Sequence, residues 1–319
     1  QNRWIKSTYS HNLVIVDDGA QRFRERNPAF RFMATTPLVS VVELASDAYA
    51  QCEGYRRLVA LVKGPKAQSF VVDIFRVRGG TKHAYRVFSE LAASDATDGQ
   101  IAFSGVDMPE EPPLPQVGAS LARKDIYGLR DVRAAKAPAA WQAEWREADR
   151  AYRLWMLTQV ERVEASNGPG QRRDQEAGRR VRYLDAVREG GGLTSIFVAV
   201  HEPSGPGGAM PIRDVTRLEL PPQTGPAAVA LRIDSSWGAY HVLSEFDEAA
   251  EVEDLRFQGT FALTRRTPEG ERGEADLQTM ALGAQTLECS GEGFAKQPDG
   301  WRGRGAVATE TLDAITAVT

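Results

Sequence analysis

Short stretches of alternating apolar and polar residues, separated by turn residues, run along most of this chain. Residues 55–62 and 69–78 show the alternation clearly, with Lys63-Gly64-Pro65 between them as a turn. Residues 83–88 follow after Gly79-Gly80, where glycine accepts a positive φ. A period of two residues is typical of half-buried strands, and strands that follow one another across short turns usually pair antiparallel. The pattern predicts an antiparallel meander or sandwich.

The first strand is expected close to the amino end. Leu13 and Ile15, and then Phe23, fit a strand, a turn and a second strand. The turn between them is Asp17-Asp18-Gly19, which has hairpin chemistry. We therefore expect a hairpin at this position.

Trp141 and Trp145 leave a choice between two kinds of element. They lie four residues apart, which suits one face of a helix, but residues 152–157 that follow are strand-like. The pattern favours two strands joined around residues 147–149. The helix stays the alternative.

The remaining pattern is also β, and it sets the domain organisation that we expect. The later alternating stretches are 179–188, 195–203, 229–233, 257–263 and 277–287. The Pro-rich residues 108–115 cannot continue a strand ladder and indicate a long connection. We predict an all-β fold, with a large supersandwich-like antiparallel β-sandwich over residues 1–205 and a smaller C-terminal β-sheet region over residues 206–319.

Composition excludes two classes of protein. A formal net charge of −4 disfavours a general nucleic-acid binder, which needs a basic face. No window approaches the roughly 20 uninterrupted apolar residues of a membrane helix. An anionic ligand would have to be met by local arginines. The cysteines, Cys52 and Cys289, lie far apart in the sequence, and free thiols are favoured over a disulfide.

The sequence before residue 7 has the character of an internal segment. It holds no Met, no positively charged leader and no cleavable apolar stretch. We therefore expect the chain to be a fragment of a longer protein.

Two segments carry a resemblance to a known family. They are Thr8-Tyr9-Ser10-His11-Asn12, which runs into residues 14–17, and residues 71–80 with His83 downstream. Together they resemble the heparinase II/III-like polysaccharide lyases, and residues 197–203 and 257–261 are similar to later strands of the same β region. Members of that family join an N-terminal (α/α) toroid to a C-terminal β-sandwich. The chain resembles the β part alone.

The resemblance implies a function and a set of site residues. The family cleaves acidic polysaccharides that contain uronic acids by β-elimination, with a tyrosine or histidine as base and usually a tyrosine as acid. By resemblance, His11 is a ligand of a structural zinc, and the catalytic residues belong to a toroid segment or chain absent from this sequence. His83, Arg78 and Asn12 are the candidate substrate-binding residues. Periplasmic or secreted localisation is also implied, and a homo-oligomer is left open.

Each site residue has a plainer alternative. A zinc site needs about four donors, and the spare candidates Asp17, Asp18, His83, His201 and His241 have no diagnostic spacing from His11. The paired-histidine stretch that the family carries upstream is missing here. His11 could instead be a hydrogen-bonded turn histidine, and His83 could sit in a solvated turn after Arg78.

A second function class remains open. The chain could be a non-catalytic carbohydrate-binding or interaction β-sandwich whose tryptophans stack on sugars or fill the core. These tryptophans are Trp4, Trp141, Trp145, Trp155, Trp237 and Trp301.

Overall fold

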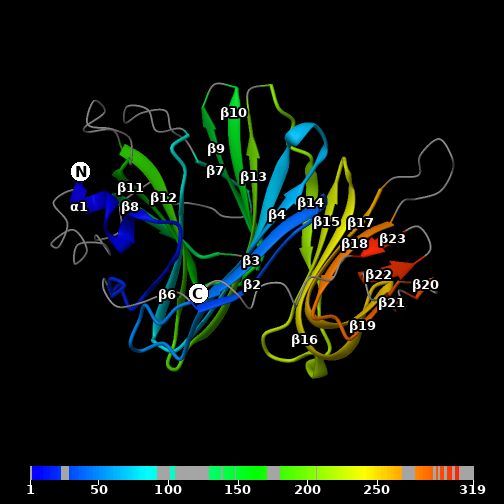
Figure 1. Ribbon diagram of the computed structural model, residues 1–319. Helices are drawn as coiled ribbons and strands as arrows, with labels where there is room; N and C mark the ends of the chain where they lie inside the picture. The colour runs from blue at the N-terminus through cyan, green and yellow to red at the C-terminus, as the bar shows by residue number, and fades with distance from the viewer. Residues whose placement is uncertain are drawn as a thin grey trace. The chain divides into compact units, whose positions relative to one another are not determined.

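The computed structural model of the chain describes most residues, with gaps (Figure 1). The described residues are 2–22, 29–91, 101–104, 129–137, 139–147, 149–170, 180–205, 207–267, 277–289, 292–293, 295–297, 300–303 and 306–308. Phe23 and the Pro-rich connection at 108–115 lie outside them.

Two large antiparallel sheets come from the first two thirds of the chain. The five-stranded sheet has the order β1 (Val14–Val16), β6 (Lys82–Phe88), β12 (Arg180–Glu189), β11 (Arg162–Pro169) and β8 (Arg130–Ala135). The eight-stranded sheet has the order β2 (Ala29–Thr35), β3 (Val39–Ala45), β4 (Gly54–Lys63), β5 (Ser69–Arg78), β13 (Thr194–Ser204), β10 (Arg150–Met156), β9 (Trp141–Glu147) and β7 (Ile101–Ser104).

Later strands form two further sheets. The seven-stranded sheet has the path β14 (Ile212–Arg217), β15 (Val229–Ser235), β16 (Gly238–Val252), β17 (Leu255–Arg266), β19 (Thr286–Cys289) and β20 (Glu292–Gly293), with β18 (Leu277–Leu282) also on β17. The three-stranded sheet comprises β21 (Ala295–Gln297), β22 (Gly300–Gly303) and β23 (Ala306–Ala308). The described helical segments are single short turns: α1 (Asn2–Ile5), η1 (Thr8–Ser10), η2 (Pro65–Ala67) and η4 (Pro222–Thr224). None of these is both long and apolar enough to cross a bilayer.

The fold class is therefore the all-β antiparallel class that the alternation predicts. The choice at Trp141 and Trp145 falls on strands, because β9 and β10 pair as an antiparallel hairpin with Trp141 opposite Met156. Burial explains the preference, since both indoles are almost completely buried on the apolar face of β9.

Contacts divide the chain into two compact units. The first comprises Gln1–Phe30, Leu44–Leu58 and Asp73–Met210, and the second comprises Arg31–Glu43, Val59–Val72 and Pro211–Thr319. Two early segments thus belong with the C-terminal residues. A domain boundary at residues 205/206 stays a prediction from the sequence.

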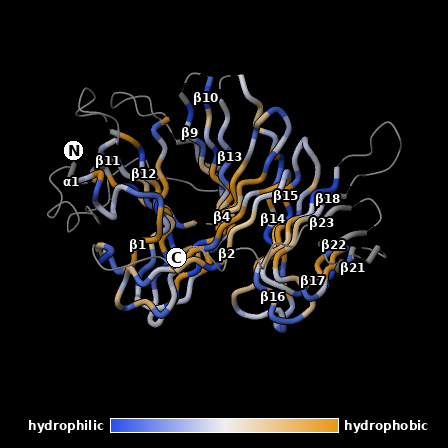
Figure 2. The backbone as a smooth tube through the Cα atoms, viewed as in Figure 1, coloured by the Kyte–Doolittle hydropathy of each residue, from blue (hydrophilic) through white to orange (hydrophobic). Residues whose placement is uncertain are grey.

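The core of the first unit lies between the five-stranded sheet and strands of the eight-stranded sheet. Val14, Tyr85 and Tyr183 come from the former sheet, and Phe75 and Phe197 come from the latter. Tyr85 and Phe197 stack with ring centroids 5.4 Å apart, so side chains of the two sheets meet directly. Figure 2 shows the hydropathy changing along β10 and β13, as expected for strands with one face in the core.

The β5–β6 turn moves the chain from one sheet to the other. Gly79 and Gly80 have φ of 98° and 89°, which L-residues with a Cβ rarely adopt. A Cβ on Gly79 would also lie 2.4 Å from the Gln51 carbonyl oxygen. Both conditions require glycine, and they allow β5 to end in the eight-stranded sheet while β6 begins in the five-stranded one.

β1 pairs with β6. The sequence suggests a partner strand for it just after Asp17-Asp18-Gly19, but Phe23 of that strand lies outside the described residues. Val14 lies opposite Tyr85, and Val16 lies opposite His83. The Asp17 carboxylate explains this pairing, because Oδ1 accepts hydrogen bonds from Thr81 N at 2.7 Å and Lys82 N at 3.0 Å. These bonds lower the pKa of Asp17 against the opposing effect of its partial burial. Asp17 therefore fastens the end of β1 to the start of β6.

The second unit has its own apolar core in the seven-stranded sheet. Leu243, Phe257, Ala262 and Leu287 are fully or almost fully buried there. Phe70 of β5 also belongs to this unit and packs edge-on against Tyr240 at 5.3 Å. Aromatic packing of Phe70 on Tyr240 thus joins residues 59–72 to the rest of the second unit.

Candidate functional site

The N-terminal turn places His11 at the surface and uses Asn12 structurally. His11 follows η1 and is exposed. The Asn12 side chain imitates a strand partner of β6: Oδ1 accepts from Phe88 N at 2.9 Å, and Nδ2 donates to Phe88 O at 3.4 Å. Asn12 therefore extends the β1–β6 ladder beyond Val14.

Arg78 and His83 lie at the opposite end of β6. Arg78 is exposed and pairs with Glu53 at 2.8 Å. His83 and Phe88 are five positions apart along β6, which is about 17 Å at the rise of a β-strand. The four residues suggested by the sequence therefore do not converge: His11 and Asn12 lie near one end of this strand, and Arg78 and His83 near the other.

His83 is buried within β6 and does not occupy the hairpin turn expected from the sequence. Nε2 lies 2.7 Å from the Gly79 carbonyl oxygen, so this nitrogen carries the proton, and Nδ1 accepts from Ser195 Oγ at 2.8 Å. Burial lowers the pKa of His83. The ring is a neutral, fully hydrogen-bonded strut between β6 and β13.

A different group of polar residues meets in the interior of the first unit. β4, β5, β13 and β10 are consecutive neighbours in the eight-stranded sheet, and they supply Arg57, Asp73, His201 and Tyr152. Tyr85 reaches the group from β6 of the facing sheet. We call these five residues the Asp73 network.

Asp73 is the centre of the network. Its side chain is 1% exposed, and Arg57 binds it with two hydrogen bonds, Nε to Oδ1 at 2.9 Å and Nη2 to Oδ2 at 2.7 Å. Burial alone would raise the pKa of Asp73, but the Arg57 charge and the surrounding hydrogen bonds hold that pKa well below its usual range. Arg57 Nη1 also donates to the Asn12 carbonyl oxygen at 2.9 Å. The network is thereby joined to the N-terminal turn.

His201 lies between two tyrosines. Tyr85 Oη donates to Asp73 Oδ2 at 2.6 Å and lies 2.9 Å from His201 Nε2. On the other side, Tyr152 Oη lies 2.5 Å from His201 Nδ1, and the two rings stack. Burial, followed by the nearby Asp73 charge, raises the pKa of both tyrosines. Both phenols are therefore neutral at ordinary pH.

The composition of the network determines what it can do chemically. A phenol, an imidazole and an ionised carboxylate in hydrogen-bond contact are groups that accept and pass protons. The sequence offers His201 only as a spare zinc candidate, and it does not single out Arg57, Asp73, Tyr85 or Tyr152. One signal was visible: Asp73 interrupts the apolar run Val71-Val72-Asp73-Ile74-Phe75, and a charge at a core position needs a partner.

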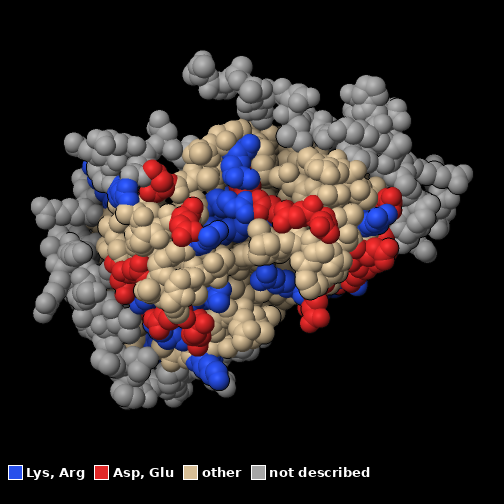
Figure 3. Space-filling view, turned by 90° about the horizontal axis from the view of Figure 1, so that it is seen from below, with Lys and Arg blue, Asp and Glu red and all other residues tan. Residues whose placement is uncertain are grey.

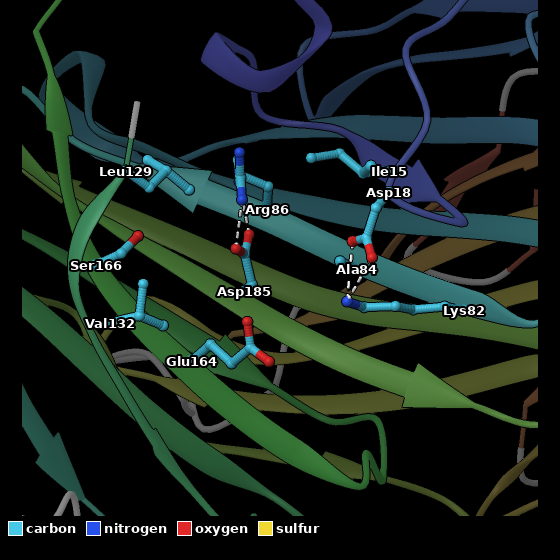
Figure 4. Close-up of a pocket in the computed structure, with 10 residues that line it drawn as sticks. All are labelled: Ile15, Asp18, Lys82, Ala84, Arg86, Leu129, Val132, Glu164, Ser166 and Asp185. Atoms are coloured by element: carbon cyan, nitrogen blue, oxygen red, sulfur yellow. Dashed lines mark hydrogen bonds and ion pairs between the residues drawn. The ribbon is translucent and has the colours of Figure 1, made fainter. Parts of the chain in front are cut away.

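A second polar cluster lies in a pocket on the five-stranded sheet (Figure 4). Its walls are Ile15, Asp18, Lys82, Ala84, Arg86, Leu129, Val132, Glu164, Ser166 and Asp185. Arg86 and Asp185 form a buried, two-pronged ion pair with Nε–Oδ1 at 2.7 Å and Nη2–Oδ2 at 2.5 Å, and Arg86 Nη1 donates to the Tyr9 carbonyl oxygen. Lys82 pairs with Asp18 at 2.9 Å. Both cations that line the pocket, Arg86 and Lys82, are therefore already paired with carboxylates.

Glu164 is the carboxyl group in this pocket whose ionised form is disfavoured by its surroundings. It lies directly opposite Asp185 in the β11–β12 register. Burial and then the Asp185 charge raise the pKa of Glu164, although Arg162 donates to it at 2.6 Å. The same Arg162 lowers the pKa of the more exposed Glu189. One arginine thus serves two carboxylates in opposite electrostatic settings.

The described residues hold one group of side chains that could bind a metal ion, and it does not include His11. Among the described residues, His11 belongs to no group of three His, Cys, Asp or Glu donors close enough to hold an ion. His241, Glu253 and Asp254 of the second unit do form such a group, and His241 Nε2 lies 2.6 Å from Glu253 Oε2. Arg232 and Arg266 pair with these carboxylates, so the group is satisfied as an ion-pair cluster. A zinc at His11 would need ligands from beyond the described residues.

Comparisons with known proteins give a likeness of fold. No protein-family profile and no curated protein matches the chain. Among solved structures, it is similar to the heparan sulfate lyase HepC from Pedobacter heparinus, with 11% identity over 78% of this chain and 32% of that one, and a TM-score of 0.47. Two structures of heparinase III are similar at 12% and 10% identity, with TM-scores of 0.46 and 0.45. They are covered over 31% and 30% of their length, and each match covers 76% of this chain. The chain therefore spans about a third of these proteins, and the likeness assigns no role to its residues.

Replacement of Asp73 should reveal how much of the stability depends on its charge. Because the pKa of Asp73 is lowered in the folded state, its stabilising effect is present above the unfolded pKa of 3.8 and is lost as pH falls toward the folded pKa. We expect Asp73→Asn to reduce the free energy of unfolding at pH 7 by about 3 kcal/mol, with a smaller difference in acid. Tyr85→Phe, which keeps the ion pair, should cost about 1 kcal/mol. Urea unfolding over a pH series measures both, and an equal pH dependence of wild type and Asp73→Asn would contradict the assignment.

Glu164 and Glu189 should change the stability of the protein with pH in opposite directions. The raised pKa of Glu164 means that its contribution is present below pH 4.5 and is lost as pH rises through the folded pKa. Glu164→Gln should therefore become more stable relative to wild type as pH rises. Glu189, whose pKa is lowered, contributes above pH 4.5, so Glu189→Gln should become less stable relative to wild type over the same rise. Melting temperatures against pH test this, and shifts of the same sign would refute it.

Proposed function

We propose that this chain is the β part of a polysaccharide lyase that cleaves uronic-acid-containing acidic polysaccharides by β-elimination. The observation that carries the proposal is that the two segments with the lyase-like sequence form one structure. Asn12 bonds to the end of β6, Asp17 bonds to its start, and Arg57 joins the Asn12 carbonyl to Asp73. Val16 of the first segment also lies opposite His83, downstream of the second, in the β1–β6 ladder, so the two segments are in direct contact.

The proposed reaction sets demands that this chain meets in part. Removing the C5 proton of a uronate requires a base and a group that neutralises the neighbouring carboxylate. The cations of the first unit described above are paired with acids, and on the face in Figure 3 basic and acidic side chains are interspersed. We infer that the chain forms one wall of the cleft, and that an (α/α)-toroid segment or chain supplies the other wall and further catalytic residues. A periplasmic or secreted location is part of the same proposal.

The carbohydrate-binding alternative is weakened by the tryptophans. Trp4, Trp141, Trp145, Trp155 and Trp237 are each at most 8% exposed. Among the residues whose side chains the structure describes, they therefore belong to cores and offer no flat platform for sugar stacking. The lyase proposal remains the better supported of the two.

The lyase activity can be tested directly on the full-length protein that contains this chain. We expect incubation with alginate, heparan sulfate, chondroitin and hyaluronan to yield an unsaturated uronate from one of them, because β-elimination leaves a C4=C5 double bond. Ultraviolet absorbance of that product is the measurement. Failure with every polymer, in protein that is folded by circular dichroism, would reject the lyase function.

Zinc binding is a separate expectation. An exposed imidazole such as His11 can offer one nitrogen to a zinc, which would brace the sandwich beside the cleft, with the remaining ligands outside this chain. Full-length protein prepared without chelator should hold about one zinc, and His11→Ala should lose it and melt at a lower temperature. His241→Ala is the control, and it should keep the metal. Zinc retained in His11→Ala but lost in His241→Ala would move the metal to the second unit.

A further inference from the structure

The hydrogen bonds of the Asp73 network allow one arrangement of protons. Asp73 is ionised and only accepts, so the single hydroxyl proton of Tyr85 points to Asp73 Oδ2. Tyr85 Oη must then accept from His201, which places the imidazole proton on Nε2. His201 Nδ1 is left with a lone pair, and it accepts the Tyr152 hydroxyl at 2.5 Å. Every bond therefore points from Tyr152 toward Asp73.

Burial gives this relay a direction. Asp73 and Tyr85 are fully buried at one end, whereas the His201 side chain is 13% exposed and Tyr152 is partly exposed. The relay thus begins at a partly exposed tyrosine and ends at a fully buried negative charge. Asp73 Oδ2 lies 3.5 Å from His201 Nε2, close enough to stabilise a positive charge on the ring.

We propose that Tyr152 and His201 form a proton-transfer pair that this chain contributes to the elimination reaction, with Asp73, held by Arg57, as the residue that positions and stabilises the imidazolium. The proposal rests on the proposed lyase function. It adds a source of catalytic groups besides the absent toroid. The acceptor site at the Tyr152 oxygen suits a C–H acid next to a carboxylate, such as C5 of a uronate.

The proton balance of the step is complete. Tyr152 passes its hydroxyl proton to His201 Nδ1 as its oxygen takes the C5 proton. The electron pair of the broken C5–H bond forms the C4=C5 double bond, the C4–O4 bond breaks, and the departing O4 takes a proton from water. The imidazolium then returns its proton to the hydroxide left behind. The charged groups that face His201 during this cycle are Asp73 and Arg57, and the titratable ones are Tyr85 and Tyr152.

Isosteric tyrosine variants of the full-length protein separate the chemistry from folding. Tyr152→Phe keeps the ring that packs on Trp145 and removes the hydroxyl alone. We expect kcat on the polymer that wild type cleaves to fall by about 100-fold or more with little change in KM, as for loss of a general base. Tyr49→Phe is the control, since Tyr49 lies outside the Asp73 network and its hydroxyl donates to Gly19 O at 3.4 Å, and it should retain wild-type kcat.

Nitrogen NMR of the histidine rings provides a readout that needs no substrate. His201 should be the Nε2–H tautomer, and its Nδ1 signal should shift in Tyr152→Phe. The outcomes separate the two proposals. Active wild type with an equally active Tyr152→Phe, or a His201 proton on Nδ1, overturns the proton-transfer pair and leaves the lyase function standing. Wild type that is inactive on every polymer overturns the lyase function, and the elimination role of the pair with it.

Discussion

The Asp73 carboxylate, buried between two sheets and held by Arg57, is the constraint on which the first unit's interior depends. An ionised carboxylate without water is tolerated only when it is paired and hydrogen-bonded. Arg57 supplies the charge, and Tyr85 and His201 occupy the remaining side of the carboxylate. Strands from both sheets therefore bond to the Asp73 carboxylate. Because this carboxylate is ionised, it also sets the orientation of the His201 ring.

The segments that resemble the lyases have a largely structural part in this chain. Gly79 and Gly80 allow the corner between sheets, Asp17 fastens β1 to β6, and His83 links β6 to β13. These contacts serve the fold of this chain. The residues that we propose for proton transfer, Tyr152 and His201, are hydrogen-bonded to each other.

Charge pairing limits the positive potential that this chain offers to the acidic substrate proposed for it. Arg57, Arg86, Lys82 and Arg78 each have a carboxylate partner. Pairing lowers the cost of burying charge, and it also removes positive potential that would attract a polyanion. In the proposed lyase, this chain would therefore contribute to proton transfer, and neutralisation of the substrate carboxylate would fall to cations from outside the residues described here.

The sequence by itself determined the fold class and the position of many strands, among them β4, β5, β12 and β13, because alternation of apolar and polar residues is a local property that each strand carries alone. It also located β9 and β10 correctly from Trp141 and Trp145. Only the tertiary structure decided that β1 pairs with β6, that His83 is buried, and that Arg57, Asp73, Tyr85, Tyr152 and His201 meet. These contacts join residues up to 128 positions apart, as for Asp73 and His201. Periodicity says which face of a strand is buried, but the partner across the core is set by sheet order and by the burial of charge.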